Sequence, residues 1–402
     1  MTPADAPAGV EARSAHRLGS RVANSAALLW VLQMVLRGLQ FVTLVVLARL
    51  LTPADIGIVA LATTVIGVLD VLTNVQVGSA LVRATRLSDG HFNTAFTLNV
   101  LRGLLTATIL VGLSWPIAHF MGNPGLRSIL CVLAIPALVN ACANPRFILF
   151  GRNLDFSMEV RRRSAGALVG SLVSIVVAFA FRSYWALIAA TVAQAVVSTA
   201  LSYWKVPGGR VPRWSLSHSR EMLGFGTWLL VQNMLGYLAL RAEYFFIGRI
   251  MDTKTLGAYH LGNQINTMAT GDVIPTLTRA LFPAFAMIHQ DPERLRRTYL
   301  NVQATCLALA LPIGFGLGLL AEPLILLFFG RGWSLAVEVV RFIAPISAIQ
   351  TMGAGVEVLA MAMNRPQGLA ARSVVNIIVR TAAIVVGFWM MGLTGLLLGR
   401  TV

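Results

Sequence analysis

The stretch ARLLTPADIGIVAL at Ala48–Leu61 returns 200 residues later as GRIMDTKTLGAYHL at Gly248–Leu261. The two stretches share an arginine, two apolar residues after it, a central glycine and a final leucine, at Arg49 and Arg249, Leu50–Leu51 and Ile250–Met251, Gly57 and Gly257, and Leu61 and Leu261. The preceding residues repeat as well, because Val31, Gln33 and Met34 align with Val231, Asn233 and Met234. In a chain of long apolar segments, such a repeat is typical of a transporter whose halves rock about a shared central site.

The alternative to a true repeat is chance similarity between two apolar helices. The shared arginine, glycine and spacing lie in the turn between helices, where a general preference for apolar residues does not produce them. We therefore predict an all-α polytopic membrane protein. Its two six-helix lobes are expected to form an internal repeat around a central cavity.

Composition agrees with a membrane protein. Hydrophobic residues make up 56% of the chain, charged residues only 12%, and the mean hydropathy is +0.74; a soluble domain carries about 25% charged residues. The net charge of +16 would suggest a nucleic-acid partner in a soluble protein. Here the basic residues occupy short loops between apolar runs, so they indicate membrane orientation and contact with anionic lipid. We expect no nucleic-acid partner.

Spans of about 20 apolar residues divide the chain. The predicted spans are 22–48, 56–82, 93–118, 126–149, 165–181, 185–204, 221–248, 256–282, 299–320, 335–362 and 373–391. A twelfth begins at Leu393, and the chain stops at Val402, so that helix looks truncated or interfacial. The predicted organisation is a cytoplasmic tail at 1–21, an N-lobe at 22–204, a linker at 205–220 and a C-lobe at 221–402.

Loop charges predict the orientation. Arginine and lysine gather at 1–21, 83–86, 146–163, 205–220, 294–297 and 365–372, whereas the opposite loops hold only Arg49, Arg127, Arg182, Arg249, Lys254 and Arg331. Because basic loops stay in the cytoplasm, the N-terminus and the linker are expected there. Six spans per lobe make the repeat parallel, with its axis along the membrane normal. No loop much exceeds twenty residues, which excludes a soluble catalytic domain and argues against a membrane glycosyltransferase or ligase. We predict that the protein is not an enzyme.

Charged side chains near mid-membrane need a partner, water or a function, because each costs about 2.5–3.5 kcal/mol on insertion scales. They are Arg37, Asp70, Arg102, Arg241, Glu243, Asp272, Arg341, Glu357 and Arg380. Arg37, Asp70 and Arg241 each share a helix face with other polar residues, in the sets Gln33–Arg37–Gln40, Thr63–Gly67–Asp70–Asn74 and Asn233–Tyr237–Arg241–Tyr244. The 200-residue offset maps the second set onto Asn263, Thr267, Thr270 and Ile274. Such faces, at corresponding places in two halves, should look at each other across a hydrated cavity.

Two readings of these charges remain open. Arg37 and Arg241 suit a ligand with phosphate oxygens, because guanidinium groups bind them in a bidentate manner. The alternative is that Arg37–Asp70 and Arg241–Glu243 or Arg241–Asp272 are interhelical pairs that only fix packing. Arg102, Arg341 and Arg380 lack a matching polar face, so packing pairs are expected there.

Three segments carry a family resemblance: LARLLTPADIGIVALATTVIGVLDVL (Leu47–Leu72), GYLALRAEYFFIGRIMDTKTLGAYHLGNQI (Gly236–Ile265) and ALFPAFAMIHQDPERLRRTYL (Ala280–Leu300). They resemble the polysaccharide-exporting flippases of the multidrug/oligosaccharidyl-lipid/polysaccharide (MOP) superfamily, in particular Wzx-type and colanic-acid or succinoglycan exporters. The resemblance implies a two-lobed bundle of at least twelve helices in a bacterial inner membrane. It also implies transfer of undecaprenyl-diphosphate-linked oligosaccharide from the cytoplasmic to the periplasmic leaflet. Glu243 stands where the family more usually shows Asp.

The expected mechanism is alternating access without covalent chemistry or a cofactor. Arg37 and Arg241 are expected to bind the diphosphate, with Gln33, Asn233 and Tyr237 contacting sugar or phosphate. Asp70, Glu243 and Asp272 are candidates for coupling to an H⁺ or Na⁺ gradient or the membrane potential, or for locking the two states. Implied partners are the lipid-linked oligosaccharide, anionic lipids, and polysaccharide polymerase and assembly proteins. The rival functions are a drug or cation antiporter of the same superfamily, which needs an acidic pocket, and a non-transporting scaffold.

Overall fold

The computed structural model describes residues 34–74, 77–78, 81, 87–152, 157–206, 212–219, 226–270, 285, 288, 291–353, 356, 359 and 367–400. These residues form helices and short connections, with no strand among them. Six of the described helices are long and apolar enough to cross a membrane, and a seventh span is formed if the bent pair Gly125–Ala141 and Pro145–Arg152 counts as one. The chain is therefore a multi-pass, all-α membrane protein, as its composition predicts.

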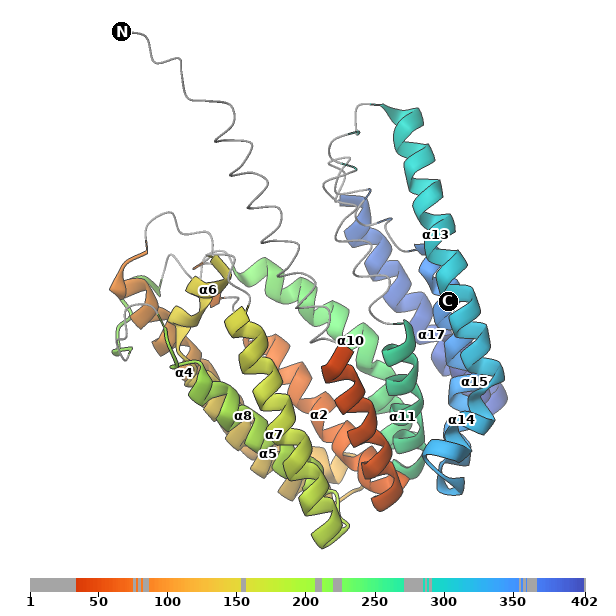
Figure 1. Cartoon of the computed structure of the whole chain (residues 1–402), viewed down its shortest axis with the longest axis horizontal. Coiled ribbons are helices and arrows are strands. Elements are labelled where there is room, and N and C mark those ends of the chain that lie inside the picture. Colours follow the sequence, from red (N-terminus) through yellow and green to blue (C-terminus); the bar gives the residue numbers. More distant parts are fainter. Residues whose placement is uncertain are drawn as a thin grey trace.

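The first half begins with a helix over 34–50. Then follow α2 (Pro53–Thr73), α4 (Asp89–Phe120), α5 (Gly125–Ala141), α6 (Ile148–Arg152), α7 (Ser157–Phe181) and α8 (Trp185–Leu201). Helices α4, α5, α7 and α8 pack against one another in antiparallel order at one side of the molecule (Figure 1). Helix α2 lies between them and the second half of the chain.

The second half contains α10 (Gly226–Ile250), α11 (Thr253–Thr270), α13 (Pro292–Leu319), α14 (Ala321–Phe328), α15 (Ser334–Gln350) and α17 (Gln367–Gly399). Helices α13, α15 and α17 form the opposite side of the molecule, and α10 and α11 pack on α2 (Figure 1). The chain reverses within α17 at Gly392, whose φ of 63° favours glycine. The two limbs then pack closely, because a Cβ at Gly387 or Gly395 would overlap the carbonyl oxygen of the other. The predicted break between spans at 391 and 393 is confirmed.

The predicted span 126–149 is wrong as a single straight helix. Helix α5 ends at Ala141, and the next turns leave it at an angle of 60°. Asn144 caps the new turn by accepting a hydrogen bond from the backbone N–H of Arg146 (3.0 Å), and Pro145 occupies its first position. Arg146 then holds the turn in place, because its guanidinium donates to Asp89 (2.6 Å) at the start of α4.

Corresponding helices of the two halves begin in the same way. At α2, the hydroxyl of Thr52 accepts from the Asp55 backbone N–H (3.3 Å), and the Asp55 carboxylate accepts from the Thr52 backbone N–H (3.0 Å). At α11, the carboxylate of Asp252 accepts from the Thr255 backbone N–H (2.6 Å). Such caps satisfy backbone donors that a helix leaves free in its first turn. Both caps follow the arginine of the repeated stretch by three residues.

The two halves meet closely where α2 crosses α11. A Cβ added at Gly57 would overlap the carbonyl oxygen of Thr253, and one added at Gly257 would overlap that of Pro53. These two contacts are related by the same 200-residue offset as the repeated stretches. Only glycine allows two helix backbones to approach so closely.

Arginines of the repeated stretch bind the opposite half at the same end of the molecule. Arg49 donates to the carbonyl oxygens of Leu327 and Phe328, the latter at 2.8 Å. Arg249 lies over the ring of Phe120, with its guanidinium carbon 5.4 Å from the centroid. Each half therefore reaches the other with an equivalent cation, and together these contacts close the arginine-poor end.

Candidate functional site

The predicted polar stripe of the second helix lies on the accessible side of α2. This helix is the most buried of the candidate spans, with 61% of its apolar window inside the protein. Thr63 and Asp70 are nevertheless exposed, and Gly67 and Asn74 are half-buried. The stripe therefore forms an accessible polar face on an otherwise buried helix, which is the arrangement a hydrated cavity requires.

The second half presents Tyr237 and Arg241 toward this region. The hydroxyl of Tyr237 lies against Gly67, because a Cβ at Gly67 would overlap it. Arg241 lies over two rings of its own helix, with its guanidinium carbon 5.9 Å from the centroid of Tyr237 and 4.9 Å from that of Tyr244. Aromatic faces attract a cation without neutralising it. Within the part of the chain that the structure describes, Arg241 thus presents its charge beside the face of α2.

Asp70 pairs with Arg102 across α2 and α4. The Nη2 atom of Arg102 lies 2.6 Å from the carboxylate, and its Nε donates to the hydroxyl of Thr73 (3.3 Å). The packing pair expected for Arg102 is confirmed. The side chain of Asp70 keeps 59% of its area exposed, so this ion pair is accessible from the open side of α2.

Glu243 lies at the centre of a buried polar cluster that joins α10, α11 and α17. Its side chain is 1% exposed, and it accepts hydrogen bonds from Arg380 (2.8 Å) and from the hydroxyl of Tyr259 (2.5 Å). The Nε atom of Arg400 lies 3.8 Å from the same carboxylate. Arg400 also donates to the Tyr259 hydroxyl (2.7 Å) and to the side-chain oxygen of Asn263 (3.1 Å).

The partners of Glu243 in this cluster differ from the partner that the sequence suggests. The sequence suggested Arg241, two residues away on the same helix, whereas the structure provides Arg380 and Arg400 from α17 and its end. The packing pair expected for Arg380 is confirmed, and so is that for Arg341, which pairs with Glu322 at 3.2 Å. Counted over the described residues, two guanidinium groups on one carboxylate give the cluster a net positive charge.

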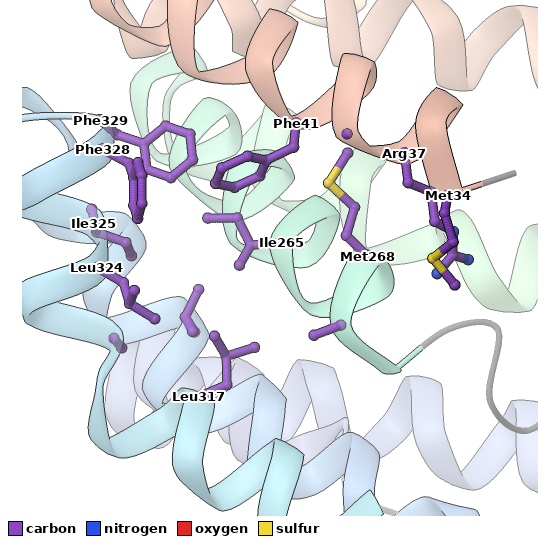
Figure 2. A pocket seen from close by; sticks show the side chains of 14 residues that line it. Met34, Arg37, Phe41, Ile265, Met268, Leu317, Leu324, Ile325, Phe328 and Phe329 are labelled. Atoms are coloured by element: carbon purple, nitrogen blue, oxygen red, sulfur yellow. The ribbon is translucent and has the colours of Figure 1, made fainter. Parts of the chain in front are cut away.

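Arg37 lines an apolar groove on the seam between the halves (Figure 2). The groove, of about 480 Å³, lies between the helix 34–50 of the first half and α11, α13, α14 and α15 of the second. Arg37 and Met34 lie at one end, and Phe328 and Phe329 at the other (Figure 2). Among the lining residues that the structure describes, Arg37 is the only one with a polar side chain.

The structure brings some candidate residues together and leaves others undefined. Tyr237 and Arg241 meet the face of α2, whereas Arg37 lies in the groove, whose lining does not include Arg241. Gln33 and Asp272 fall outside the described residues. Asn233 belongs to α10, and its side chain is likewise not described. The roles of these residues therefore stay predictions.

Sequence reasoning missed Tyr259, His260 and Arg400. Tyr259 is fully buried against Glu243, and the ring of His260 lies beside Tyr244, with its Nδ1 3.4 Å from the tyrosine hydroxyl. The signal was present, because Tyr259, His260 and Asn263 are polar residues within one predicted span. Arg400 is placed in the cluster only by the reversal at Gly392, which composition alone does not reveal.

Solved structures share this arrangement of helices. The lipid II flippase MurJ in an inward closed conformation aligns with a TM-score of 0.75 over 93% of this chain and 84% of its own, at 10% identity. An inward-facing multidrug resistance MATE family transporter of the MOP superfamily aligns with a TM-score of 0.64 over 90% of each chain, at 15% identity. At these identities the likeness establishes the fold, which is that of MOP superfamily transporters.

Sequence relatives narrow the assignment. The chain is 24% identical to the lipopolysaccharide biosynthesis protein WzxC of Escherichia coli (strain K12), over 90% of this chain and 74% of the relative. It is 26% identical to the succinoglycan biosynthesis transport protein ExoT of Rhizobium meliloti (strain 1021), over 78% of this chain and 64% of the relative. The family model described as "Polysaccharide biosynthesis protein" matches residues 46–338, which is most of the chain. The chain therefore belongs to this family of polysaccharide biosynthesis proteins.

Proposed function

We propose that the protein is a flippase that moves an undecaprenyl-diphosphate-linked oligosaccharide from the cytoplasmic to the periplasmic leaflet of a bacterial inner membrane. The observation that carries this proposal is the family match over residues 46–338, together with relatives named for lipopolysaccharide and succinoglycan biosynthesis. The lipid-linked product would then serve surface polysaccharide assembly, with polymerase and assembly proteins acting next.

The charge of the accessible faces supports an anionic substrate. Arg241 keeps its positive charge between two tyrosine rings, and Arg37 lies on the seam between the halves. Both guanidinium groups suit the oxygens of a diphosphate. Gln33, Asn233 and Tyr237 are proposed to contact sugar or phosphate on the same faces. No covalent step is needed, because the substrate leaves with the bonds with which it arrived.

Alternating access is the proposed mechanism. The contacts of Gly57, Gly257 and Arg49 close one end of the boundary between the halves. With the N-terminus and the 205–220 linker in the cytoplasm, that end faces the periplasm. Transport would then require these contacts to separate while the halves close at the other end. The driving force would be an H⁺ or Na⁺ gradient or the membrane potential.

The surroundings of the acidic residues weigh against a cation antiporter. A cation site needs carboxylates that are not already neutralised, and Glu243 is held by Arg380 and Arg400 while Asp70 is held by Arg102. Glu243 is thus better suited to holding α10 and α17 together than to coupling. Asp70 is the better coupling candidate of the two, because water can reach its carboxylate. Asp272 remains a candidate for either role.

Deletion and complementation test the proposal. Deleting the gene should abolish the surface polysaccharide and leave its lipid-linked repeat unit in the cytoplasmic leaflet, inaccessible to a glycosidase added outside spheroplasts. A plasmid copy should restore both. The proposal fails if the polysaccharide persists in the deletion strain. Increased sensitivity to organic cations with normal polysaccharide would instead identify a drug antiporter.

A further inference from the structure

The groove at Arg37 has two properties that distinguish a ligand site from a gap left by helix packing. Its walls are apolar along their length, and Arg37 is the cation at one end among the lining residues that the structure describes (Figure 2). Its volume of about 480 Å³ falls within the usual range for ligand sites, which is about 300–1,000 Å³. A ligand that matches this groove is a single apolar chain with an anionic group at its end.

The position of Arg37 agrees with such a ligand. Arg37 precedes Arg49, at the closed end of the seam, by twelve residues, or about 18 Å along the helix axis. The hydrocarbon core is about 30 Å thick, so with Arg49 at the membrane boundary Arg37 would lie near the middle of the core. The apolar part of the groove extends from Arg37 toward the closed end, where the ring of Phe41 packs edge-on against Phe328 at a centroid distance of 5.3 Å. In the proposed orientation, a lipid of the cytoplasmic leaflet would place its head at Arg37, on the cytoplasmic side of the groove, with its tail toward the periplasm.

A second groove provides a comparison within the same molecule. It has a volume of about 700 Å³ and lies between α5, α7 and α8, with walls that include Ile135, Phe181, Ile188 and Ala193. No charged residue occurs among the residues described as lining it. It lies within one half of the molecule, whereas the groove at Arg37 lies between the halves. A lipid tail in the second groove would therefore meet neither a cation nor the boundary that moves.

We infer that the groove at Arg37 holds a segment of the polyprenyl chain of the substrate while Arg37 binds its diphosphate. This inference rests on the proposed function and adds the site of the lipid to it. The groove is bounded by both halves, so an occupant would contact both sides of the seam. A polyprenyl chain in the groove would thus be displaced, or would move, when the halves change position.

Gly38 allows the groove to be blocked without disturbing the fold. It lies in the lining beside Arg37, and a Cβ added there meets no atom within 4 Å. Leucine also favours a helix more than glycine does, so Gly38→Leu should accumulate normally. Gly112 in α4 is the matched control, because it is exposed and a Cβ there also meets no atom within 4 Å. Gly112→Leu adds the same side chain away from both grooves.

The test uses purified protein in lipid nanodiscs and a photoreactive undecaprenyl diphosphate without sugar. Cross-links should map by mass spectrometry to the helix 34–50 and to α11 near Met268. Gly38→Leu should lower this labelling by about tenfold, because excluding two buried methylene groups has that effect on affinity. Gly112→Leu should label like the unmodified protein. Arg37→Gln should lower labelling by the diphosphate by roughly tenfold, since a charge-assisted hydrogen bond contributes on that order. It should leave labelling by photoreactive undecaprenol, which lacks phosphate, unchanged.

Two results would overturn the inference. One is labelling of Gly38→Leu equal to that of Gly112→Leu; the other is full competition by phosphatidylglycerol, which would make the groove a general phospholipid site. The same variants in the deletion strain separate this inference from the proposed function. If the unmodified gene restores polysaccharide and Gly38→Leu does so equally, the lipid site is wrong and the flippase proposal stands. If the unmodified gene restores none while labelling follows the expected pattern, the flippase proposal fails and the lipid site stands.

Discussion

Two acidic side chains of similar chemistry differ in their surroundings. Asp70 pairs with Arg102 at an accessible helix face, with 59% of its side chain exposed, whereas Glu243 is 1% exposed and is surrounded by Arg380, Arg400 and Tyr259. Water can solvate Asp70 if its partner leaves. Among the residues that the structure describes, the cluster stabilises the charge of Glu243, and Glu243 is the carboxylate that offsets the two guanidinium groups. Removing either carboxylate should therefore have very different consequences.

Replacing Glu243 with glutamine should destabilise the protein by about 3–5 kcal/mol, because it leaves two largely buried guanidinium groups without their carboxylate partner. Replacing Asp70 with asparagine, the matched control, should change stability by less than about 1 kcal/mol, as for other exposed ion pairs. The measurement is the midpoint of thermal unfolding of each purified variant in detergent. The double variant Glu243→Gln/Arg380→Gln should recover part of the loss. Equal midpoints for the two single variants would contradict this account of the cluster.

Arg241 should be required for export rather than for folding. Arg241→Gln should lower surface polysaccharide while the protein accumulates normally, because glutamine keeps hydrogen-bond donors and loses the charge and the planar fork. Arg241→Lys should restore export only in part if both nitrogen atoms of the fork bind phosphate. Polysaccharide is measured in the deletion strain, and protein level by immunoblot of membranes. Failure of the glutamine variant to accumulate would instead assign Arg241 a structural role with Tyr237 and Tyr244.

The sequence predicts which charges are paired better than it predicts their partners. Arg102, Arg341 and Arg380 stand without a polar face, and each forms an ion pair in the structure. The partner of Glu243 was not predictable, because Arg380 is 137 residues away and comes into reach only through the packing of α17 on α10. Spacing along one helix reveals shared faces, whereas pairing across helices depends on packing that a single sequence does not contain.

At the scale of helices, the crossing of α2 and α11 depends on two glycines. Gly57→Ala and Gly257→Ala should each destabilise the protein by about 1–3 kcal/mol, because the new methyl group overlaps a backbone carbonyl that cannot rotate away. Their effects should be similar in size if the two halves are related as the repeat predicts. Gly112→Ala should be neutral or slightly stabilising, because nothing lies within 4 Å and alanine favours the helix. Thermal unfolding in detergent measures all three, and a neutral result at both positions would show that the crossing is not tightly packed.

Helix boundaries were predictable where the chain itself marks them. The apolar run stops and restarts at Gly392, and the chain reverses there with a positive φ. The bend after α5 was missed because apolar residues resume at 147–150 directly after Asn144, Pro145 and Arg146, so the predicted span was carried across these three residues. The sequence Asn144–Pro145 carries the signal for that bend, since asparagine caps a turn and proline begins one. Hydropathy alone does not detect this signal, because it reports how apolar a segment is and not the direction in which the chain runs.

For the whole molecule, the orientation in the membrane sets the direction of transport. Cysteine at position 213, in the arginine-rich linker, should resist an impermeant thiol reagent added outside intact cells, whereas cysteine at position 331, at the opposite end, should react. Both positions are exposed, so access depends on the side of the membrane. The variants are made in a protein without Cys131, Cys142 and Cys306. Labelling of 213 but not 331 would reverse the proposed direction.

The contacts at the arginine-poor end join both halves and should hold the molecule in its present state. Arg49 donates to the carbonyl oxygens of Leu327 and Phe328, and the indole N–H of Trp333 donates to that of Ala48 at 2.8 Å. If the halves rock, these bonds must break for this end to open. Arg49→Ala removes two of these hydrogen bonds. It should shift the population toward the open state, because the lost bonds join the two halves and do not stabilise either half by itself.

The shift can be measured by the accessibility of the face of α2. Thr63→Cys places a thiol on that face, beyond the closed end, in the protein without native cysteines. An impermeant reagent added from the periplasmic side should label it several-fold faster in the Arg49→Ala background, because loss of about 1 kcal/mol from the closed state changes the ratio of states about fivefold. Arg127→Ala, at an exposed arginine of the same end, should leave the rate unchanged. Equal rates in all three backgrounds would mean that Arg49 does not hold the halves together, and that the opening must be sought at Gly57 and Gly257.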